Sequence, residues 1–197
     1  MRKILFSIFM LMLLMFSCAG LPPEQPPVTP APVIPTRIMG TGRVSRENMA
    51  GFLSETNPAV SREQAALMAR LYIEEARIEG INADVAFSQM CLETGFLRFG
   101  GLVTPDMNNF CGLGSTGPGQ AGEKFPSPQI GVRAHIQHLK GYASTDPLNS
   151  ELVDPRYRWV KYGTAPTVHD LAGRWAADKE YGNKISGILQ RLYDYSF

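Results

Sequence analysis

The sequence predicts a mainly α-helical protein with one globular domain. Helix-start and helix-stop residues alternate along the chain, as in the stretch that Ser61 opens and Gly80 closes. Between such signals, apolar residues recur at helical spacing. The chain has 197 residues, of which 44% are hydrophobic and 19% charged, as is usual for a single globular domain. We therefore expect helices packed around one core.

The first three helices are expected in the first half of the chain, at about 45–52, at 61–80 and from Asn82 to Thr94, where Gly95 ends the third. In the second helix, Gln64 follows Ser61 at the spacing of a capping box. The core-facing side of that helix should carry Ala65, Met68, Leu71, Tyr72, Ala76 and Ile78.

A segment rich in glycine and proline, 100–128, interrupts the helical pattern. We expect loops there, with one short hairpin at most, and we expect this segment to form the floor of a cleft. Further helices should span 130–142 and 182–195, and another should start at Thr167 with Asp170 in a capping position.

Residues 1–18 have the pattern of an export signal, because two basic residues precede an apolar run at 4–16. The run is shorter than the ~20 residues needed to cross a bilayer core. We favour lipid attachment at Cys18, which would anchor the protein to a membrane. Cleavage after Ala19 by an ordinary signal peptidase is the alternative. Either route exports the protein, and the lipid-anchored form would face the periplasm or cell wall.

Residues 19–42 are predicted to form a proline-rich tether, and 43–197 the globular domain. Prolines lack the amide donor that helix interiors and sheets require. The tether's prolines are Pro22, Pro23, Pro26, Pro27, Pro30, Pro32 and Pro35.

Charge and motifs exclude several functions. The formal net charge of +1 gives no field for nucleic acid, so we expect no nucleic-acid partner. The sequence has no phosphate-binding loop, dinucleotide-binding glycine pattern or His-Glu-x-x-His zinc motif. No cysteine or carboxylate lies at ligand spacing from His135, His138 or His169. We therefore expect no metal and no cofactor.

Glu93 occupies the position that most suggests chemistry. It lies at the margin of an apolar stripe on the third helix, close to the stop signal Gly95. Partial loss of water should raise its pKa above the usual ~4.3, as a proton donor to a glycosidic oxygen requires. Periodicity alone leaves a surface glutamate at a helix end as the alternative. The stripe consists of Ala83, Ala86, Phe87, Met90 and Cys91.

Four segments, in order, resemble the glucosaminidase family, glycoside hydrolase family 73. They are Leu92–Phe96, Asn109–Gly114, Phe125–Ser144 together with Asp154–Tyr157, and Trp175–Tyr181. The resemblance covers the chain from about Ser61 to its C-terminus. It implies a lysozyme-like fold with a short β-hairpin or loop region lining the active-site cleft. It also implies hydrolysis of the bond after N-acetylglucosamine in the glycan strands of peptidoglycan.

The resemblance assigns roles to particular residues. Glu93 matches the catalytic acid and Tyr181 a tyrosine of the active-site cleft. Asn109 and Phe110 match the hairpin segment that lines the cleft. Trp175 and Lys179 stand where a Tyr and a Pro are commoner in the family. Candidate substrate contacts are Asn109, Phe110, Tyr157, Trp175 and Asp178, the aromatic ones because aromatic rings stack on sugars.

The second catalytic carboxylate is harder to assign, because the loop that usually carries it is short and glycine-rich here. Glu123 is the first candidate and Asp106 the second. Carboxylates stand ~5 to 5.5 Å apart in retaining enzymes and ~6.5 to 9.5 Å apart in inverting ones. If neither acid approaches Glu93, the substrate's own acetamido group could act as the nucleophile.

Other readings of the sequence remain. Cys91 and Cys111 could form a disulfide beside Glu93, or stay as two buried thiols. A lytic transglycosylase would use one glutamate on the same fold. A Cys/His peptidase and a non-catalytic cell-wall-binding lipoprotein are further alternatives. In every case we expect a monomer.

Overall fold

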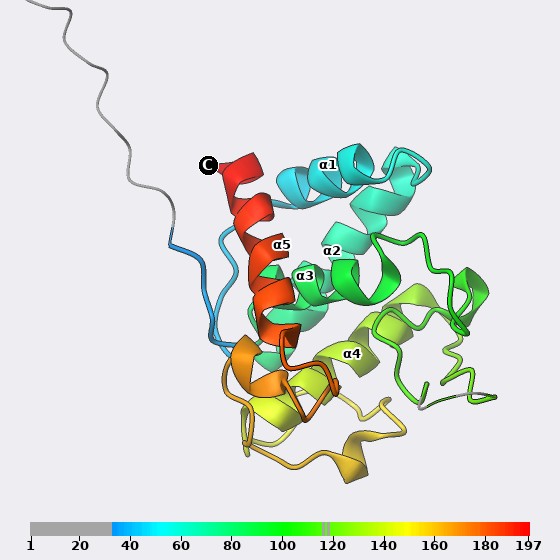
Figure 1. The fold of residues 1–197 in the computed structure, drawn as a ribbon, viewed down its shortest axis with the longest axis vertical. Coiled ribbons are helices and arrows are strands. Elements are labelled where there is room, and N and C mark those ends of the chain that lie inside the picture. Colours follow the sequence, from blue (N-terminus) through cyan, green and yellow to red (C-terminus); the bar gives the residue numbers. More distant parts are fainter. Residues whose placement is uncertain (1–32, 116, 118) are drawn as a thin grey trace, which may run out of the picture. The chain divides into compact units, whose positions relative to one another are not determined.

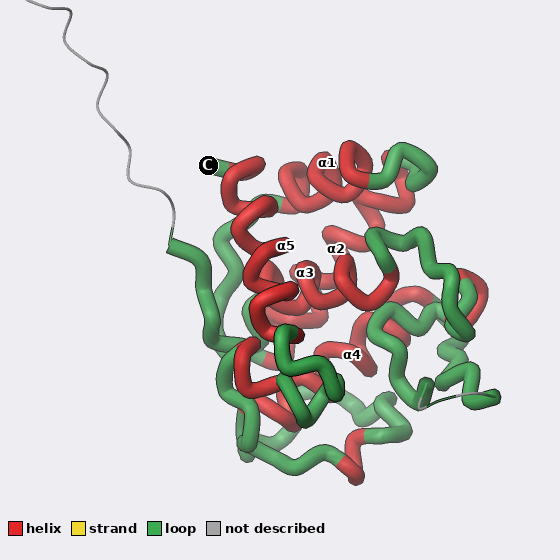
Figure 2. Tube along the Cα trace, in the orientation of Figure 1, coloured by secondary structure: helices red, strands yellow, loops and turns green. Residues whose placement is uncertain are grey.

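The computed structural model describes residues 33–115, 117 and 119–197 (Figure 1). In this part the elements are helical, and the only β pairing is a set of isolated bridges (Figure 2). The expected export signal, Cys18 and most of the tether lie outside the described residues. The mainly α class is confirmed. The α-helices are α1 (Arg46–Thr56), α2 (Arg62–Glu79), α3 (Ala83–Thr94), α4 (Pro128–Ala143) and α5 (Tyr181–Ser196), with 3-10 helices η1 (Pro105–Met107), η2 (Tyr157–Trp159) and η3 (Val168–Leu171).

Helix α3 lies at the centre of the domain, with α2, α4 and α5 packed against it (Figure 1). Its expected apolar stripe is buried, but so are the polar side chains of Asp84, Ser88 and Gln89 on its other sides. A helix buried all round must satisfy its polar groups internally. Asp84 does so by accepting hydrogen bonds from the backbone of Arg43 and from the Tyr193 hydroxyl.

The ends of α2 and α3 follow the capping signals in the sequence. The Ser61 hydroxyl accepts a hydrogen bond from the amide of Gln64 at 3.2 Å. The side chain of Asn82 accepts from two amides at the start of α3. Gly95 ends α3 with a φ of 57°, in the left-handed region that favours glycine. These caps fix where α3 ends, and therefore where Glu93 lies.

Five of the six residues predicted for the buried face of α2 are buried, and Ala69, Glu75 and Glu79 are buried in addition. Ile78 is only partly buried, whereas its neighbour Glu79 is 1% exposed. Glu79 can be buried because the Lys140 ammonium donates to its carboxylate at 2.9 Å and Ser150 donates to it as well. Apolar periodicity cannot predict a buried ion pair of this kind, because both partners read as surface residues.

Residues before 43, the predicted start of the globular domain, contact that domain in the structure. The backbone of Ile38 donates to Pro166 and accepts from Asn82, and its side chain is fully buried. The amide of Gly40 donates to Gly80. The chain that follows Pro35 is thus held against the domain. It contains no further proline before the first helix, so its backbone amides can donate hydrogen bonds to the domain.

One expected helix differs from the observed element, whereas the loop segment at 100–128 agrees with its prediction. The helix expected from Thr167 is the four-residue η3, although Thr167 and Asp170 do form the capping box. The chain turns at once, with a φ of 74° at Gly173. Between 100 and 128 the described residues form η1 and glycine turns, in agreement with the expected loops, with one isolated bridge between Gly117 and Gln120.

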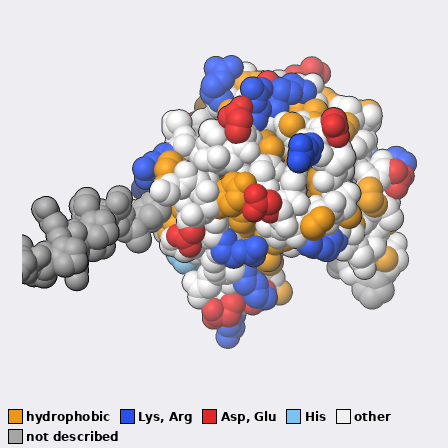
Figure 3. Space-filling model, turned by 90° about the horizontal axis from the view of Figure 1, so that it is seen from above, with side chains coloured by type: hydrophobic (Ala, Val, Ile, Leu, Met, Phe, Trp, Pro, Cys, Tyr) orange, Lys and Arg blue, Asp and Glu red, His pale blue; other side chains and the backbone are white. Residues whose placement is uncertain are grey.

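The described surface on the face that bears α1 and the end of α5 has charges of both signs. Acidic and basic side chains are interspersed there, with apolar groups between them (Figure 3). No described helix is long and apolar enough to cross a membrane.

Candidate active site

A cavity of about 670 Å³ opens beside the C-terminal end of α3. Its walls come from three segments: the end of α3, the loop between Phe99 and Ser115, and the turn before α5. The lining residues are Glu93, Thr94, Gly95, Phe99, Gly101, Leu102, Val103, Asn109, Cys111, Gly112, Ser115, Trp175, Ala176 and Ala177. Glu93 is the one carboxylate among these described residues. The cavity is therefore a cleft with a single acid in its wall.

The two oxygens of the Glu93 carboxyl group have different surroundings. The Tyr181 hydroxyl donates a short hydrogen bond to Oε1. Oε2 faces Gly112, where a Cβ atom would lie 3.7 Å away. Because Tyr181 already donates to Oε1, a proton on the carboxyl group belongs on Oε2. That proton would point into the cleft.

The pKa of Glu93 is raised above its ordinary value, as the sequence predicted. Burial is the main cause, and hydrogen bonding from the side chains of Tyr181 and Trp175 partly opposes it. The pKa of Tyr181 is itself raised, first by burial and then by the Glu93 charge. Tyr181 therefore keeps its proton near neutral pH and stays a donor to Glu93. The arrangement suits an acid that must donate a proton and then carry a negative charge.

A chain of buried hydrogen bonds continues from Tyr181 into the core. The Gln89 amide donates to the Tyr181 hydroxyl at 2.8 Å, and the Gln89 carbonyl lies 3.0 Å from Nε2 of His135. The other ring nitrogen, Nδ1, lies 2.8 Å from the Tyr72 hydroxyl. Burial lowers the pKa of His135 to about 3, so the ring is neutral. Nε2 then carries the hydrogen, and each donor in the chain points toward Glu93.

The backbone after Glu93 adopts an uncommon conformation. Gly95, Phe96 and Leu97 have φ values of 57°, 60° and 62°, and the latter two are not glycine. Left-handed conformation costs roughly 1–2 kcal/mol for such residues. Side-chain and backbone bonds hold the turn: Thr94 Oγ1 accepts from Leu97, and the Asn57 side chain donates to Phe96. Strain of this kind is typical of functional sites.

Asn109 organises the loop that faces Glu93. Its side-chain amide donates to the carbonyls of Leu113 and Glu123, and its carbonyl accepts from the Leu113 amide. Asn109 is fully buried and lines the cleft. Its three bonds fix the turn that carries Gly112, so its role in the fold is to place the floor of the cleft.

Of the other predicted substrate contacts, Trp175 lines the cleft and the rest do not. Phe110 is 5% exposed and belongs to the core, because its side chain points away from the loop surface. Tyr157 packs beside Gly141 and the ring of Tyr162. Asp178 pairs with Lys184 at the start of α5. These three residues are not among the described lining residues of this cleft, and their contact with substrate stays a prediction.

Neither candidate for the second carboxylate lines the cleft. Glu123 lies 3.9 Å from Arg156, and Asp106 is an exposed acid held by Lys124 and Thr104. The Glu123 backbone is tied to Asn109 and Leu113, which directs its side chain to the far side of the Gly114 turn. No described group of three or more His, Cys, Asp or Glu side chains could hold a metal ion.

Cys91 and Cys111 are both free in the described structure, which agrees with the alternative of two buried thiols. Cys91 belongs to the main core around α3, whereas Cys111 packs with Leu113, Phe125 and Ala134 in a separate cluster. Burial raises the pKa of both thiols, so their reactive thiolate forms are disfavoured.

Sequence reasoning missed the inner chain of Gln89, His135 and Tyr72. One signal was available: Gln89 stands four residues before Glu93, so the two share a face of α3. The pairing with His135 was not accessible, because it joins residues 46 positions apart. His135 is fully buried, and its hydrogen bonds to Gln89 and Tyr72 make it part of the site's support.

Comparison with known proteins identifies the family. The S. aureus autolysin E, whose crystal structure is a complex with the muropeptide NAM-L-Ala-D-iGlu, superimposes with a TM-score of 0.52 at 14% identity, over 82% of this chain and 74% of that one. This likeness confirms the lysozyme-like fold. An uncharacterized protein of Borreliella burgdorferi is 42% identical over 159 residues, which are 81% of this chain and 78% of the relative. Residues 69–194 match the sequence model of the glucosaminidase family, described as mannosyl-glycoprotein endo-beta-N-acetylglucosaminidase. The chain therefore belongs to the glucosaminidase family.

Proposed function

We propose that this protein hydrolyses the glycan strands of bacterial peptidoglycan, cleaving the bond after N-acetylglucosamine with Glu93 as the general acid. The observation that carries the proposal is the Glu93 carboxyl group: partly buried, raised in pKa, fixed through Oε1 and open to the cleft through Oε2. Membership of the glucosaminidase family supports the reaction. The muropeptide named for the S. aureus autolysin supports peptidoglycan as the substrate.

In this mechanism Glu93 gives its Oε2 proton to the glycosidic oxygen as the bond to the anomeric carbon breaks. No second carboxylate is among the described lining residues, so the acetamido oxygen of the substrate attacks the anomeric carbon instead. Water then opens the resulting ring, and the Glu93 carboxylate takes a proton from that water. Tyr181 stabilises the carboxylate between the two steps. Configuration at the anomeric carbon is retained.

Mass spectrometry of digested peptidoglycan tests the reaction. New reducing N-acetylglucosamine ends are expected, whereas anhydro-muramic ends would identify a lytic transglycosylase. Glu93→Gln should lose turnover while still binding peptidoglycan. Normal turnover by this variant would remove Glu93 from the mechanism.

The variant Glu123→Gln tests whether the group that assists Glu93 is the substrate's acetamido group or the Glu123 carboxylate. If the acetamido group is the nucleophile, this variant keeps its activity, and a substrate lacking the acetyl group is not cleaved. If Glu123 is the second carboxylate, the variant loses activity by several orders of magnitude. Replacing Cys91 and Cys111 with alanine should leave turnover unchanged, which would exclude a cysteine peptidase.

We also propose that the protein is exported and anchored through a lipid on Cys18, facing the periplasm or cell wall as a monomer. The export pattern of residues 1–18 supports this. Labelling with a fatty acid should mark the wild-type chain and not Cys18→Ala. Light scattering should give the mass of one chain.

A further inference from the structure

A second cavity, of about 270 Å³, adjoins the cleft. The two share Cys111, Gly112, Ser115 and Trp175 as lining residues, so they lie on either side of one wall. The second cavity is also lined by Leu113, Gly114, His138, Tyr142, Arg156, Trp159 and Arg174. The proposed reaction makes no use of it.

Two arginines supply the full positive charges in the wall of this cavity. Arg156 and Arg174 line it, and no carboxylate is among the described lining residues. Two acids stand behind the wall: Glu123 forms an ion pair with Arg156 at 3.9 Å without reaching hydrogen-bonding distance, and Asp154 lies 2.7 Å from Nδ1 of His138. Arg174 uses Nη1 on the Asp170 carbonyl, which leaves further donors of its five N–H groups. Guanidinium groups placed in this way bind carboxylates by paired hydrogen bonds.

Trp159 gives the cavity an apolar edge and packs against Arg156, one of the two lining arginines. The ring is 56% exposed. The Arg156 guanidinium lies 4.6 Å from the ring centre and that of Arg158 lies 4.1 Å from it. Stacking on the ring orients a guanidinium without consuming its hydrogen-bond donors. The edge is therefore suited to a short peptide that has both apolar and acidic groups.

We propose that this cavity binds the carboxylate groups of the stem peptides carried by peptidoglycan, through Arg156 and Arg174. The inference rests on the proposed function. In peptidoglycan, short acidic peptides branch from the muramic acid next to each N-acetylglucosamine. A glycan bound at Glu93 would direct such a branch across the Gly112 wall. The cavity would then make the enzyme favour glycans that still carry their peptides.

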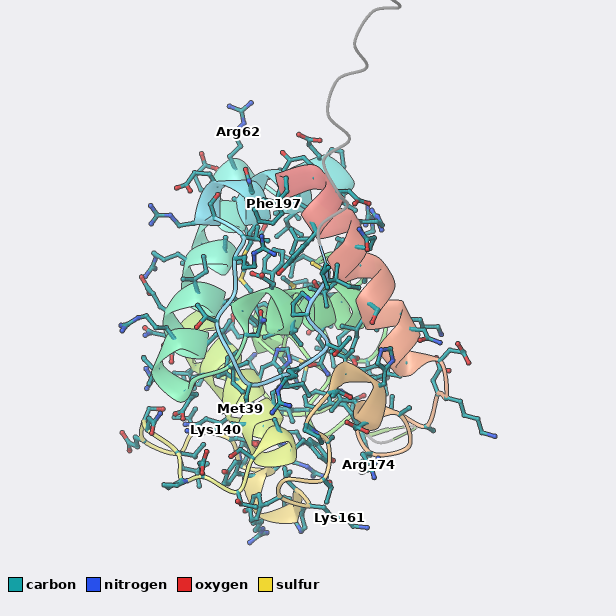
Figure 4. The ribbon with its side chains drawn as sticks, turned by 90° about the vertical axis from the view of Figure 1, so that its left-hand side faces the viewer. Met39, Arg62, Lys140, Lys161, Arg174 and Phe197 are labelled. Atoms are coloured by element: carbon teal, nitrogen blue, oxygen red, sulfur yellow. The ribbon has the colours of Figure 1, made fainter. Side chains whose placement is uncertain are left out.

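The first test compares three substrates with the full chain: peptide-bearing glycan, glycan stripped of peptides by an amidase, and neutral N-acetylglucosamine oligomers. The Arg156→Gln/Arg174→Gln double variant should lower the ratio of kcat/KM for peptide-bearing over neutral substrate by about tenfold. Arg62→Gln is the matched control, because Arg62 is exposed and lies at the other end of the domain from Arg174 (Figure 4). Its ratio should equal that of the wild type, and the Arg→Lys double variant should recover part of the preference.

Stripping the peptides leaves a free lactyl carboxylate on the muramic acid, which is a second source of the same charge. If the double variant loses as much on stripped glycan as on peptide-bearing glycan, the cavity binds the lactyl group and the stem-peptide proposal is overturned. An unchanged ratio on all three substrates also overturns it.

A binding measurement keeps this inference separate from the proposed reaction. In the Glu93→Gln background, calorimetry with a soluble muropeptide should give a Kd about tenfold weaker when both arginines are replaced. This difference is expected even if the wild-type chain cleaves no glycan, in which case only the proposed function fails. Equal Kd values, with unchanged thermal unfolding of the variants, would refute the cavity's role.

Discussion

Replacing Tyr181 with phenylalanine removes one hydroxyl from the centre of the site. That hydroxyl donates to Oε1 of Glu93 and accepts from the Gln89 amide at 2.8 Å. Phenylalanine keeps the ring in the core, where Tyr181 is 4% exposed, so packing changes little. The substitution therefore tests two hydrogen bonds and almost nothing else.

The expected magnitudes follow from those two bonds. A hydrogen bond to a charged group is worth about 1.5–3 kcal/mol, and an unsatisfied buried donor costs about 1–3 kcal/mol. Glu93 becomes negative as it gives up its proton, so the lost bond raises the barrier. At 1.36 kcal/mol for each tenfold change, kcat should fall by roughly 10- to 100-fold. The free energy of unfolding should fall by about 1–3 kcal/mol, because Gln89 is left buried with a donor unpaired.

The direction of the pH effect is the sharper test. Tyr181 lowers the pKa of Glu93 against the larger effect of burial. Without the hydroxyl, that pKa rises further, and the acid stays protonated to higher pH. The alkaline limb of kcat/KM should therefore move to higher pH in Tyr181→Phe while the plateau falls.

The matched control is Tyr195→Phe, because the Tyr195 hydroxyl donates to Glu55 at 2.9 Å on the exposed surface. It makes the same substitution in the same kind of bond, and we expect no change in the pH profile. If the limb of Tyr181→Phe stays in place or moves to lower pH, Glu93 is not the acid that the profile reports.

Three further predictions concern stability and the cleft floor. Gly112→Ala should lower activity more than Gly80→Ala at a similar loss of stability, because both glycines have a φ near 70° but only the Gly112 Cβ approaches Glu93 Oε2. Equal losses of activity per folded molecule would contradict this. Glu79→Gln should lower the free energy of unfolding, measured in urea, by about 3–5 kcal/mol, because it leaves the Lys140 charge buried without its partner. Its control is Glu74→Gln on the same helix. Glu74 forms an exposed pair with Arg70, so this variant should lower the free energy of unfolding by about 0.5 kcal/mol or less. Glu93→Gln should raise the melting temperature at pH 8, because the raised pKa of Glu93 makes its ionised form unfavourable in the folded state; the gain should vanish as pH falls toward 4.5, the ordinary value. A gain independent of pH would point to packing instead.

Local signals in the sequence were sufficient to place Glu93 at the end of α3. Asn82 and Gly95 define the ends of α3, and the apolar stripe between them orients Glu93 at its margin. These features depend on neighbours within one helical turn or two, so they can be predicted without the rest of the fold. The family motifs added Tyr181, although its distance from Glu93 along the chain is 88 residues.

Predictions about the loops were less successful, for a physical reason. The contacts of three loop residues depend on partners that are distant in the sequence or unpredictable from the loop itself. Phe110 packs in the core, Tyr157 packs beside Gly141, and Asp178 pairs with Lys184. Loop residues have no periodicity that fixes a face. Long-range ion pairs such as Glu79 with Lys140 could not be predicted for a related reason, because each partner taken alone is typical of a solvent-exposed residue.

The protonation state of His135 decides the direction of the hydrogen bonds that run from Tyr72 through Gln89 to Tyr181. If His135 were protonated, both its ring nitrogens would donate, and the Tyr72 hydroxyl could no longer donate to Nδ1. Burial first, and then His138, lower the pKa of His135 to about 3, so this reversal lies below the working range. Above that pKa, every donor in the chain points toward Glu93. The hydrogen bond from Tyr181 to the Glu93 carboxylate is therefore supported in the same way across the neutral range. His135 therefore contributes no titration of its own between pH 5 and 8, and it acts by keeping the polarity of the chain constant.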